Sequence, residues 1–415
     1  MTRAATSPLP AWAPGNGARR ARDFFFLLAI VLLNYTLFRP SPVDVSFTVA
    51  LILALVARQR ITAGAFFFIT LIVAWLCSLV FASFPYADDE DVMYQIWKIS
   101  FATTIGIGAC LAAVHWGAEA LRRFLRVWIF AGLIAATLGI LGFVGGIEDF
   151  TWDGRAKGLF DDPNMYAAFL IPAILGCLHF LSLGEGRRFV HAACLPWLTL
   201  GILLSFSRVG IVACLLLALA LVMLHNRRAL AKVLVYGAVA VMIVGALVVV
   251  AALFFDGFDD KVLDRFTLAK DYDLGEQGRF ARYMGSINFI LANPGGMGLL
   301  QYEKMFPEPI HNIWISSFLN FGWAAGFAFT FLVLFAVTIS IRNFRATRDP
   351  VCLTLMLAWL GILAYAVLHE SERWRHLWLM TGLVWGIHPG SWGIAAVHAV
   401  ARRRQPVTAA QPVTA

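Results

Sequence analysis

The sequence predicts an all-α polytopic membrane protein with about twelve transmembrane helices. Three observations support this fold class. Hydrophobic residues make up 60% of the 415 positions, and charged residues only 14%. Apolar runs long enough to cross about 30 Å of hydrocarbon follow one another along most of the chain. The loops between these runs alternate between basic and acidic composition, which is the pattern that orients membrane helices.

The predicted membrane helices are apolar segments joined mostly by short loops. They span residues 24–38, 43–57, 62–83, 92–115, 124–145, 164–183, 189–204, 208–225, 229–255, 313–341, 351–368 and 376–398. The second, seventh and eighth segments are short, and Pro389-Gly390 interrupts the last. A count of about eleven helices is therefore the alternative.

Charge placement predicts the orientation of the chain. With the N-terminus in the cytoplasm, every inner loop is basic, as at Arg122-Arg123, while outer loops carry acids such as Asp88-Asp89. The pattern predicts cytoplasmic tails at residues 1–23 and 399–415, a membrane domain at 24–398, and a large periplasmic loop at 256–312. The formal charge of +8 is then a topology signal, so we expect membrane lipids and no nucleic acid as partners.

No motif indicates a cleaved secretory signal, a disulfide framework or a zinc site. The apolar run from Phe24 to Phe38 is followed by Arg39-Pro40 and not by a small-residue cleavage site, so we expect the chain to stay in the membrane. All six cysteines fall inside apolar segments, where we expect small buried side chains and neither disulfides nor metal ligands.

The predicted outer loop at 256–312 is unusually rich in cations for that face of a membrane. The cations are Lys261, Arg265, Lys270, Arg279, Arg282, Lys304 and His311. Because positive charge is normally depleted in outer loops, this insertion needs a reason beyond topology. We interpret it as a binding site for an anionic lipid headgroup.

Within that loop, residues 278–293 predict an amphipathic helix at the bilayer surface. Apolar side chains recur at helical spacing from Phe280 to Leu291, and Asn293-Pro294 ends the pattern. Arg279 and Arg282 lie one turn apart and flank the apolar stripe. A guanidinium fork suits a phosphate or diphosphate, whereas the alternative is an ordinary interfacial helix whose arginines meet bulk lipid phosphates.

Two histidines are candidates for acid–base chemistry. His311 comes just before the predicted helix that begins at Ile313, where the positive end of the helix dipole disfavours imidazolium and leaves a neutral proton acceptor. A simple helix-capping role is the alternative for His311. His369 shares a short outer turn with Arg373 and Arg375, and we expect it to line the same cavity as His311.

Three further cations belong to the same face. The connection Ser205-Phe-Ser207 is so short that it holds Arg208 at the membrane boundary, as a phosphate clamp or, alternatively, as a snorkelling side chain. Arg155 and Lys157 lie in the second outer loop, which ends in a predicted helix start at Asp162-Pro163-Asn164.

Together these motifs resemble the O-antigen ligase and polymerase superfamily of bacterial inner-membrane glycosyltransferases. The motifs are Gly158-Leu-Phe-Asp-Asp-Pro163-Asn164, Ser207-Arg208-Val-Gly, Gly278-Arg279 with Asn293-Pro294-x-x-x-Gly298, and His311-Asn312 with Asn320-Phe-Gly322. They follow one another in the family's order over residues 158 to 325. Tyr283 stands where the family usually has Trp, and Gly295-Gly-Met-Gly298 replaces a plainer Leu-Gly-x-Gly. We expect neither departure to touch a proposed chemical group.

The resemblance implies a GT-C-like fold and glycan transfer at the periplasmic face of the bacterial inner membrane. It implies an undecaprenyl-diphosphate-linked O-antigen as donor and the lipid A–core oligosaccharide as acceptor. The predicted roles are His311 as the base, Arg208 and Arg279 as diphosphate ligands, Arg282 or His369 as support, and Arg155 and Lys157 as further substrate-binding cations.

Other functions and cofactors remain as alternatives at this point. An O-antigen polymerase and a protein O-oligosaccharyltransferase belong to the same superfamily, and a polytopic lipid flippase or transporter also has twelve helices. Transport predicts charge inside the membrane, yet only Lys98 lies deep in an apolar segment. Asp271-Tyr-Asp273 is either a metal-binding DxD triplet or a set of solvated loop charges. We expect the latter, with no metal and no cofactor.

Overall fold

The computed structural model describes residues 16–36, 41–57, 61–225, 278–306 and 309–390, together with a few single positions. Most of the helix predicted at 229–255, and residues 256–277 of the loop predicted at 256–312, lie outside the described residues. So do Lys261, Arg265, Lys270 and the Asp271-Tyr-Asp273 triplet.

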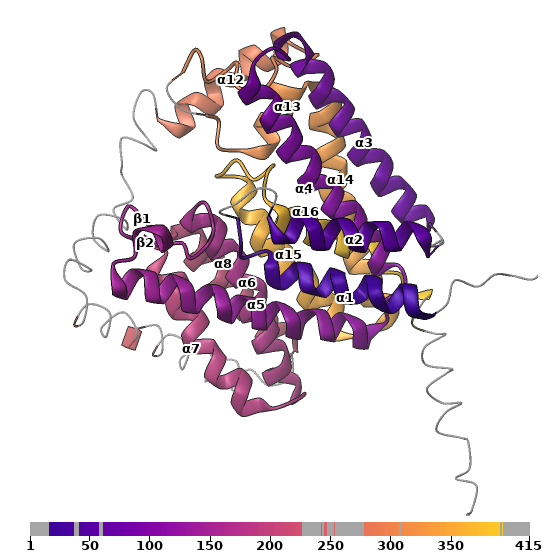
Figure 1. The fold of residues 1–415 in the computed structure, drawn as a ribbon, viewed down its shortest axis with the longest axis vertical. Helices are drawn as coiled ribbons and strands as arrows, with labels where there is room; N and C mark the ends of the chain where they lie inside the picture. The colour runs from indigo at the N-terminus through magenta and orange to yellow at the C-terminus, as the bar shows by residue number, and fades with distance from the viewer. Residues whose placement is uncertain are drawn as a thin grey trace, which may run out of the picture.

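The described chain is almost entirely helical, as Figure 1 shows. Its helices are α1 (Asn16–Leu32), α2 (Pro42–Val56), α3 (Ala63–Ser83), α4 (Glu90–Ala113), α5 (Ala118–Gly145), α6 (Pro163–Leu183), α7 (Arg188–Leu204), α8 (Arg208–His225), α12 (Arg279–Ala292), α13 (Ile313–Phe321), α14 (Trp323–Thr347), α15 (Pro350–Ala366) and α16 (Arg375–Gly386). Short 3-10 turns lie at Phe84–Tyr86 and Glu148–Phe150.

The structure is that of an all-α polytopic membrane protein. Among the described residues, six helices are long and apolar enough to cross a membrane, namely α4, α5, α6, α8, α14 and the segment Ala63–Tyr86 that contains α3. The helices α2, α7 and α15 are shorter and also apolar. Large apolar side chains such as Phe81 and Leu216 are more than half exposed, as expected for surfaces that face lipid.

The helix α6 forms the centre of one half of the bundle. Every residue from Tyr166 to Ile171 is fully buried, and α5, α7, α8 and α15 pack around it. Its start follows directly from the sequence, because the Asp162 carboxylate accepts hydrogen bonds from the backbone N–H groups of Asn164 and Met165. The predicted helix start at Asp162-Pro163-Asn164 is therefore confirmed.

The loop before α6 contains the one sheet in the described part of the chain. Strands β1 (Thr151–Trp152) and β2 (Arg155–Ala156) form an antiparallel pair. Asp153 and Gly154 connect them with φ values of 52° and 63°. An Asp-Gly pair in the left-handed region forms the tight turn that matches the twist of a hairpin. This small hairpin gives Arg155 a fixed position.

Two predicted helices differ from the structure. The single helix predicted at 313–341 is divided into α13 and α14 by Gly322, whose φ is 89°. The backbone N–H of Trp323 donates to the Pro294 carbonyl at 2.9 Å instead of continuing the first helix. The helix predicted at 376–398 ends at Gly386, three residues before Pro389.

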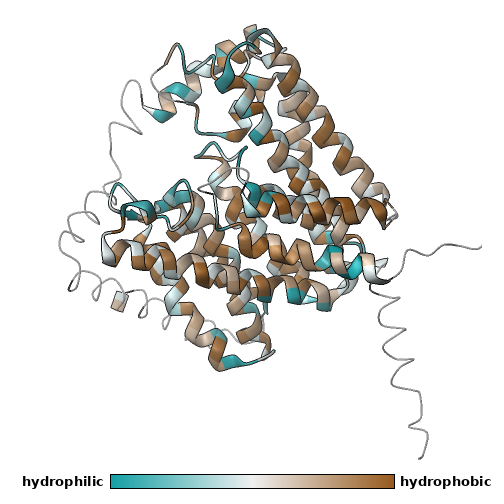
Figure 2. Ribbon diagram, viewed as in Figure 1, coloured by the Kyte–Doolittle hydropathy of each residue, from teal (hydrophilic) through white to brown (hydrophobic). Residues whose placement is uncertain are grey.

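The bundle has two polar ends, and α4 runs between them. Residues Asp89 and Gln95 mark its first end, where they contact Lys304 and Arg373. Near its other end, α4 packs closely against α16. A methyl group added to Gly386 of α16 would overlap the Cys110 carbonyl oxygen of α4. Figure 2 shows hydrophilic residues gathered at the β1–β2 hairpin and the loops near α12, with hydrophobic residues along the helices.

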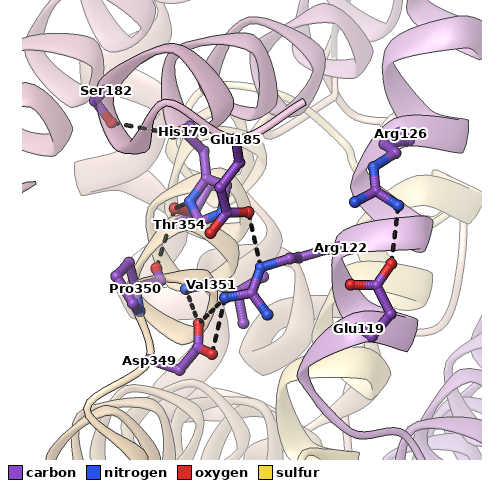
Figure 3. Close-up of polar contacts among 10 residues, drawn as sticks. All are labelled: Glu119, Arg122, Arg126, His179, Ser182, Glu185, Asp349, Pro350, Val351 and Thr354. Carbon is purple, nitrogen blue, oxygen red and sulfur yellow. Dashed lines mark hydrogen bonds and ion pairs between the residues drawn. The ribbon is translucent and has the colours of Figure 1, made fainter. Parts of the chain in front are cut away.

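An ion-pair network closes the end opposite to α12 (Figure 3). The Arg122 guanidinium of α5 donates to Glu185 at 2.9 Å and to Asp349 at 3.0 Å. Glu185 follows α6, and Asp349 caps the start of α15. One arginine therefore joins α5, the turn after α6 and the start of α15, which lie far apart in the sequence.

We predict that Gly322→Ala destabilises the fold. Gly322 has φ 89° and ψ 175°, and an added methyl group would come within 2.6 Å of the Gly295 carbonyl carbon. This region of backbone space is nearly restricted to glycine, and occupying it with another residue costs about 1–3 kcal/mol. Chemical denaturation in detergent should show a loss of at least that size. Gly64→Ala is the control, because its methyl group would meet nothing within 4 Å. Equal stability of the two variants would contradict the prediction.

Candidate active site

A cavity of about 410 Å³ opens at the end of the bundle where α12 lies. Its lining is polar on one side and aromatic on the other. The polar and charged lining residues include Lys98, Asp161, Asp162, His311, His369, Glu370, Arg373 and Arg375, and the aromatic ones include Trp97, Phe101, Trp152, Phe160 and Trp374. A cavity with few charged groups among aromatic faces suits a large ligand that carries sugars and an anionic group.

The connection between α7 and α8 is anchored to the β1–β2 hairpin and to α15. Arg155 donates through Nε to the Ser205 carbonyl at 2.8 Å, and Ser207 Oγ lies 3.0 Å from the Tyr365 hydroxyl. Both Ser205 and Ser207 are buried. Arg208, the first residue of α8, is therefore attached to a fixed turn, as its short connection predicted.

His369 is the meeting point of several candidate residues. Its ring lies 6.5 Å from the His311 ring and 5.7 Å from the Tyr365 ring, measured between centroids. Burial, and then the nearby positive charges of Arg279, His311 and Arg155, lower the pKa of His369 to about 3. His369 is therefore a neutral imidazole at physiological pH. The groups that lower its pKa lie close to its ring.

The helix α12 packs beside His311 and His369. Its apolar residues Phe280, Met284 and Leu291 are about half exposed or more, whereas Arg282 is only 6% exposed. The predicted amphipathic helix is thus present, and its arginine at 282 faces the protein. Arg282 donates through Nη1 to the Pro309 carbonyl at 3.4 Å, two residues before His311.

Tyr283 contacts the backbone of the candidate base His311. Its hydroxyl donates to the His311 carbonyl at 2.9 Å and to the Val367 carbonyl at 3.2 Å. His311 has φ 45°, an uncommon backbone conformation for a residue other than glycine. A strained backbone fixed by a neighbouring side chain is a feature of functional sites.

The position of His311 next to a helix start agrees with the sequence prediction, but the cap is its neighbour. Asn312 accepts hydrogen bonds from the N–H groups of Trp314 and Ile315, and its amide donates to the Val367 carbonyl at 3.0 Å. Asn312 therefore caps α13, so the His311 ring is left to line the cavity.

The structure brings most of the predicted residues to one end of the bundle, but not Lys157. His311 and His369 line the cavity, and Arg155 and Arg279 act on His369. Lys157 is half-buried, donates to the Asp149 carbonyl at 2.7 Å within its own loop and is not among the residues that line the cavity. A flexible lysine in a short loop reaches the nearest carbonyl, which the sequence did not reveal.

Two cavity cations were missed as site residues. Lys98 of α4 lines the cavity with its amine 4.4 Å from the Tyr94 ring centroid, and Arg373 binds Glu370 at 3.0 Å. The sequence signal for Lys98 was a charge deep in an apolar segment, which was considered only as evidence for transport. Arg375 is occupied by an ion pair with the buried Asp44 at 2.9 Å, which ties α16 to α2.

Backbone hydrogen bonds join the motif segment after α12 to the motif segment at the end of α13. The N–H groups of Met297 and Gly298 donate to the carbonyls of Leu319 and Asn320, each at 2.9 Å. These bonds join the segment after α12 to the last turn of α13. The motif residues Asn293-Pro294-x-x-x-Gly298 and Asn320-Phe-Gly322 therefore lock α12 to the helix that follows His311.

The chain is a polytopic membrane protein with a cavity at one end, where two histidines line the cavity and arginines lie close to His369. Comparison with known proteins gives a family match. Residues 193–330 match the family model described as O-antigen ligase, and this range contains Arg208, Arg279, Arg282 and His311. This match supports the resemblance to the O-antigen ligase and polymerase superfamily that the motifs predicted.

Individual relatives are more distant. The chain is 28% identical over 152 residues to an O-antigen polymerase of Salmonella muenchen, a match that covers 36% of this chain and 37% of the relative. It also resembles a chain from the structure "Structural coordination of polymerization and crosslinking by a peptidoglycan synthase complex". That likeness covers 79% of this chain and 97% of the other, with 15% identity and a TM-score of 0.44.

We predict that Ser207 and Tyr365 are energetically coupled. Ser207→Ala and Tyr365→Phe each remove the same buried hydrogen bond, so each should lower the free energy of unfolding by about 1 kcal/mol. Because both variants lose one shared interaction, the double variant should lose less than the sum of the two. Denaturation of all four forms in detergent measures the coupling. Strict additivity would show that the two hydroxyls do not interact.

Proposed function

We propose that this chain transfers an undecaprenyl-diphosphate-linked O-antigen polysaccharide to the lipid A–core oligosaccharide. The observation that carries the proposal is that the family-matched segment places His311 in the lining of the cavity and Arg279 close to His369. That segment contributes Arg208, Arg279 and His311 to the end of the bundle where His369 lies. Cations suit a diphosphate leaving group, and a cavity-lining imidazole suits a hydroxyl acceptor.

The proposed mechanism is a single displacement. His311 takes the proton of the acceptor hydroxyl, and the hydroxyl oxygen attacks the anomeric carbon as the bond to the carrier diphosphate breaks. Arg208 and Arg279 hold the departing diphosphate, so the negative charge that develops there is stabilised. Attack from the face opposite to the leaving group inverts the anomeric configuration. With its pKa lowered to about 3, His369 is a weak base, so His311 beside it is the proposed proton acceptor.

Carrier chemistry also supports a metal-free reaction at the periplasmic face of the bacterial inner membrane. The donor brings its own leaving group, so no nucleotide is needed there. Basic residues such as Arg122 and Arg126 gather at the other end of the bundle, which by the distribution of positive charge is cytoplasmic. The predicted domains follow, with cytoplasmic tails at residues 1–23 and 399–415 around a membrane domain.

An O-antigen polymerase is the second candidate, and the Salmonella relative favours it. The two activities differ only in the acceptor. The purified chain in lipid vesicles with carrier-linked glycan should elongate lipid A–core in the absence of nucleotide and with EDTA present. Transfer only to a second carrier-linked glycan would instead assign a polymerase, and transfer only to a protein would assign an O-oligosaccharyltransferase.

We predict that His311→Ala stops transfer but leaves the carrier-linked donor bound. The arginines proposed to hold the diphosphate remain, whereas the loss of a general base slows a reaction by about 10²–10⁴-fold. Single-turnover transfer and donor binding on one preparation measure both quantities. His388→Ala, at an exposed position after α16, is the matched histidine control. Transfer above about a tenth of the normal rate would remove His311 from the mechanism.

We predict that Arg279→Lys loses most of the activity although the charge is kept. A lysine cannot reproduce the two parallel hydrogen bonds that a guanidinium makes to a diphosphate. Losing one donor to the developing charge costs on the order of 3 kcal/mol, about a hundredfold in rate. Arg126→Lys is the control, because Arg126 pairs with Glu119 at the far end of the bundle. Near-normal turnover of the Arg279 variant would reduce this arginine to a lipid anchor.

A further inference from the structure

A second cavity of about 270 Å³ adjoins the first, and its charged lining residues are three glutamates and one arginine. The two share Pro309, Glu370 and Arg373 as lining residues, so a ligand in one lies beside the other. The side cavity is lined in addition by Gln95, Glu303, Ser316, Asn320 and Glu372 among its polar residues. We refer to it below as the side cavity.

Three carboxyl groups in the side cavity face one guanidinium. Arg373 binds Glu370 at 3.0 Å and the Gln95 side chain at 3.2 Å. Burial raises the pKa of Glu303, Glu370 and Glu372, and in Glu370, burial and the neighbouring Glu372 outweigh Arg373 and raise the pKa to about 8. The carboxyl groups are therefore undercompensated, and the cavity disfavours an anion.

An amide oxygen in the same cavity lacks a hydrogen-bond donor. Asn320 is 8% exposed, and its Nδ2 donates to Ser316 Oγ at 3.1 Å, but its buried Oδ1 has no hydrogen-bond partner. A buried acceptor without a donor costs about 1–3 kcal/mol, so a ligand that supplies one is favoured there. The carboxyl groups, of which Glu370 is largely protonated near pH 7, and this amide together offer several acceptors and a donor.

We propose that the side cavity is a subsite for a sugar residue that carries hydroxyl or amino groups and no acidic group. The inference rests on the proposed function and adds the recognition of the glycan itself. Hydroxyl and ammonium groups supply the donors that Glu303, Glu370 and Asn320 accept. The arginines near His369 hold the diphosphate, whereas the side cavity already holds three carboxyl groups for one guanidinium and disfavours a further anion, so the two regions orient the substrate.

A metal ion fits the side cavity less well than a sugar. Among the described residues, no three His, Cys, Asp or Glu side chains are grouped so that they hold a metal ion. The carboxyl groups of Glu303 and Glu370 come from different segments, and Arg373 already binds Glu370. A sugar ring, in contrast, offers several donors over the span of one cavity and needs no common centre.

Ligand-observed saturation-transfer NMR on the purified full-length chain tests this binding without turnover. The probes are methyl β-glucoside, methyl β-glucosaminide and methyl β-glucuronide, which share one ring and differ in charge. The glucoside and glucosaminide should receive saturation, and the glucuronide should bind several-fold more weakly. Equal binding of the glucuronide, or binding of none of the three, would overturn the proposal. Either result would leave the transfer reaction untouched, because that is measured separately.

Two variants locate the binding in the side cavity. Glu303→Gln removes one carboxylate at constant shape, so the preference against the glucuronide should shrink. Asn320→Leu removes the amide acceptor and should weaken the glucoside by about fivefold, the size of one neutral hydrogen bond. Glu148→Gln, at an exposed position outside both cavities, is the control. Thermal unfolding of each variant verifies the fold. If both folded variants bind all three probes as the parent does, the side cavity is not the subsite.

The same variants identify which substrate supplies the sugar. In the vesicle assay, Glu303→Gln should raise KM for one glycan substrate and leave kcat and the KM of the other nearly unchanged. A higher KM for lipid A–core places an acceptor sugar in the side cavity, and a higher KM for the carrier-linked glycan places a donor sugar there. A fall in kcat with both KM values unchanged would contradict a binding role.

Discussion

The hydrogen bond between Ser207 and Tyr365 connects the two halves of the candidate site. Tyr365 is fully buried, its hydroxyl reaches the turn that precedes Arg208, and its ring packs against His369 and Trp374. A methyl group on Gly210 would overlap the Tyr365 hydroxyl, so glycine there is what allows the approach. Because both hydroxyl groups are buried, breaking this bond would leave them without a partner. The bond therefore keeps Arg208 and His369 in a fixed relative position.

The remaining parts of the site are attached to this pair by backbone carbonyls. Arg155 reaches the Ser205 carbonyl, while Tyr283 and Asn312 both donate to the Val367 carbonyl at the end of α15. Chain segments from four regions of the sequence thus meet around His369. A charged substrate of this size needs cations held in place beforehand, because a flexible loop loses binding free energy when it becomes ordered.

The sequence predicted the helices and the candidate residues better than their contacts. Hydropathy identified the membrane segments, and local capping chemistry identified the start of α6 at Asp162. The break at Gly322 was not predicted, because it depends on the Pro294 carbonyl, which is distant in sequence. Three further features were not predicted for the same reason. They are the contact of Tyr283 with the His311 backbone, the contact of Lys157 within its own loop, and the acidic side cavity. Each depends on which carbonyl or carboxyl group the fold brings near, and no periodicity records that.

The family motifs acquire separate physical roles in this light. Arg208, Arg279 and His311 are candidates for chemistry, whereas Gly298 and Gly322 join α12 to α13 and α14 through the backbone. Asn320 has both kinds of role, since its carbonyl accepts from Gly298 and its side chain lines the side cavity. A single residue therefore connects the geometry that positions α12 to the surface proposed to bind sugar. A substitution at Asn320 changes the side chain and keeps the backbone carbonyl, so a folded Asn320 variant tests the cavity surface while the bond from Gly298 can remain.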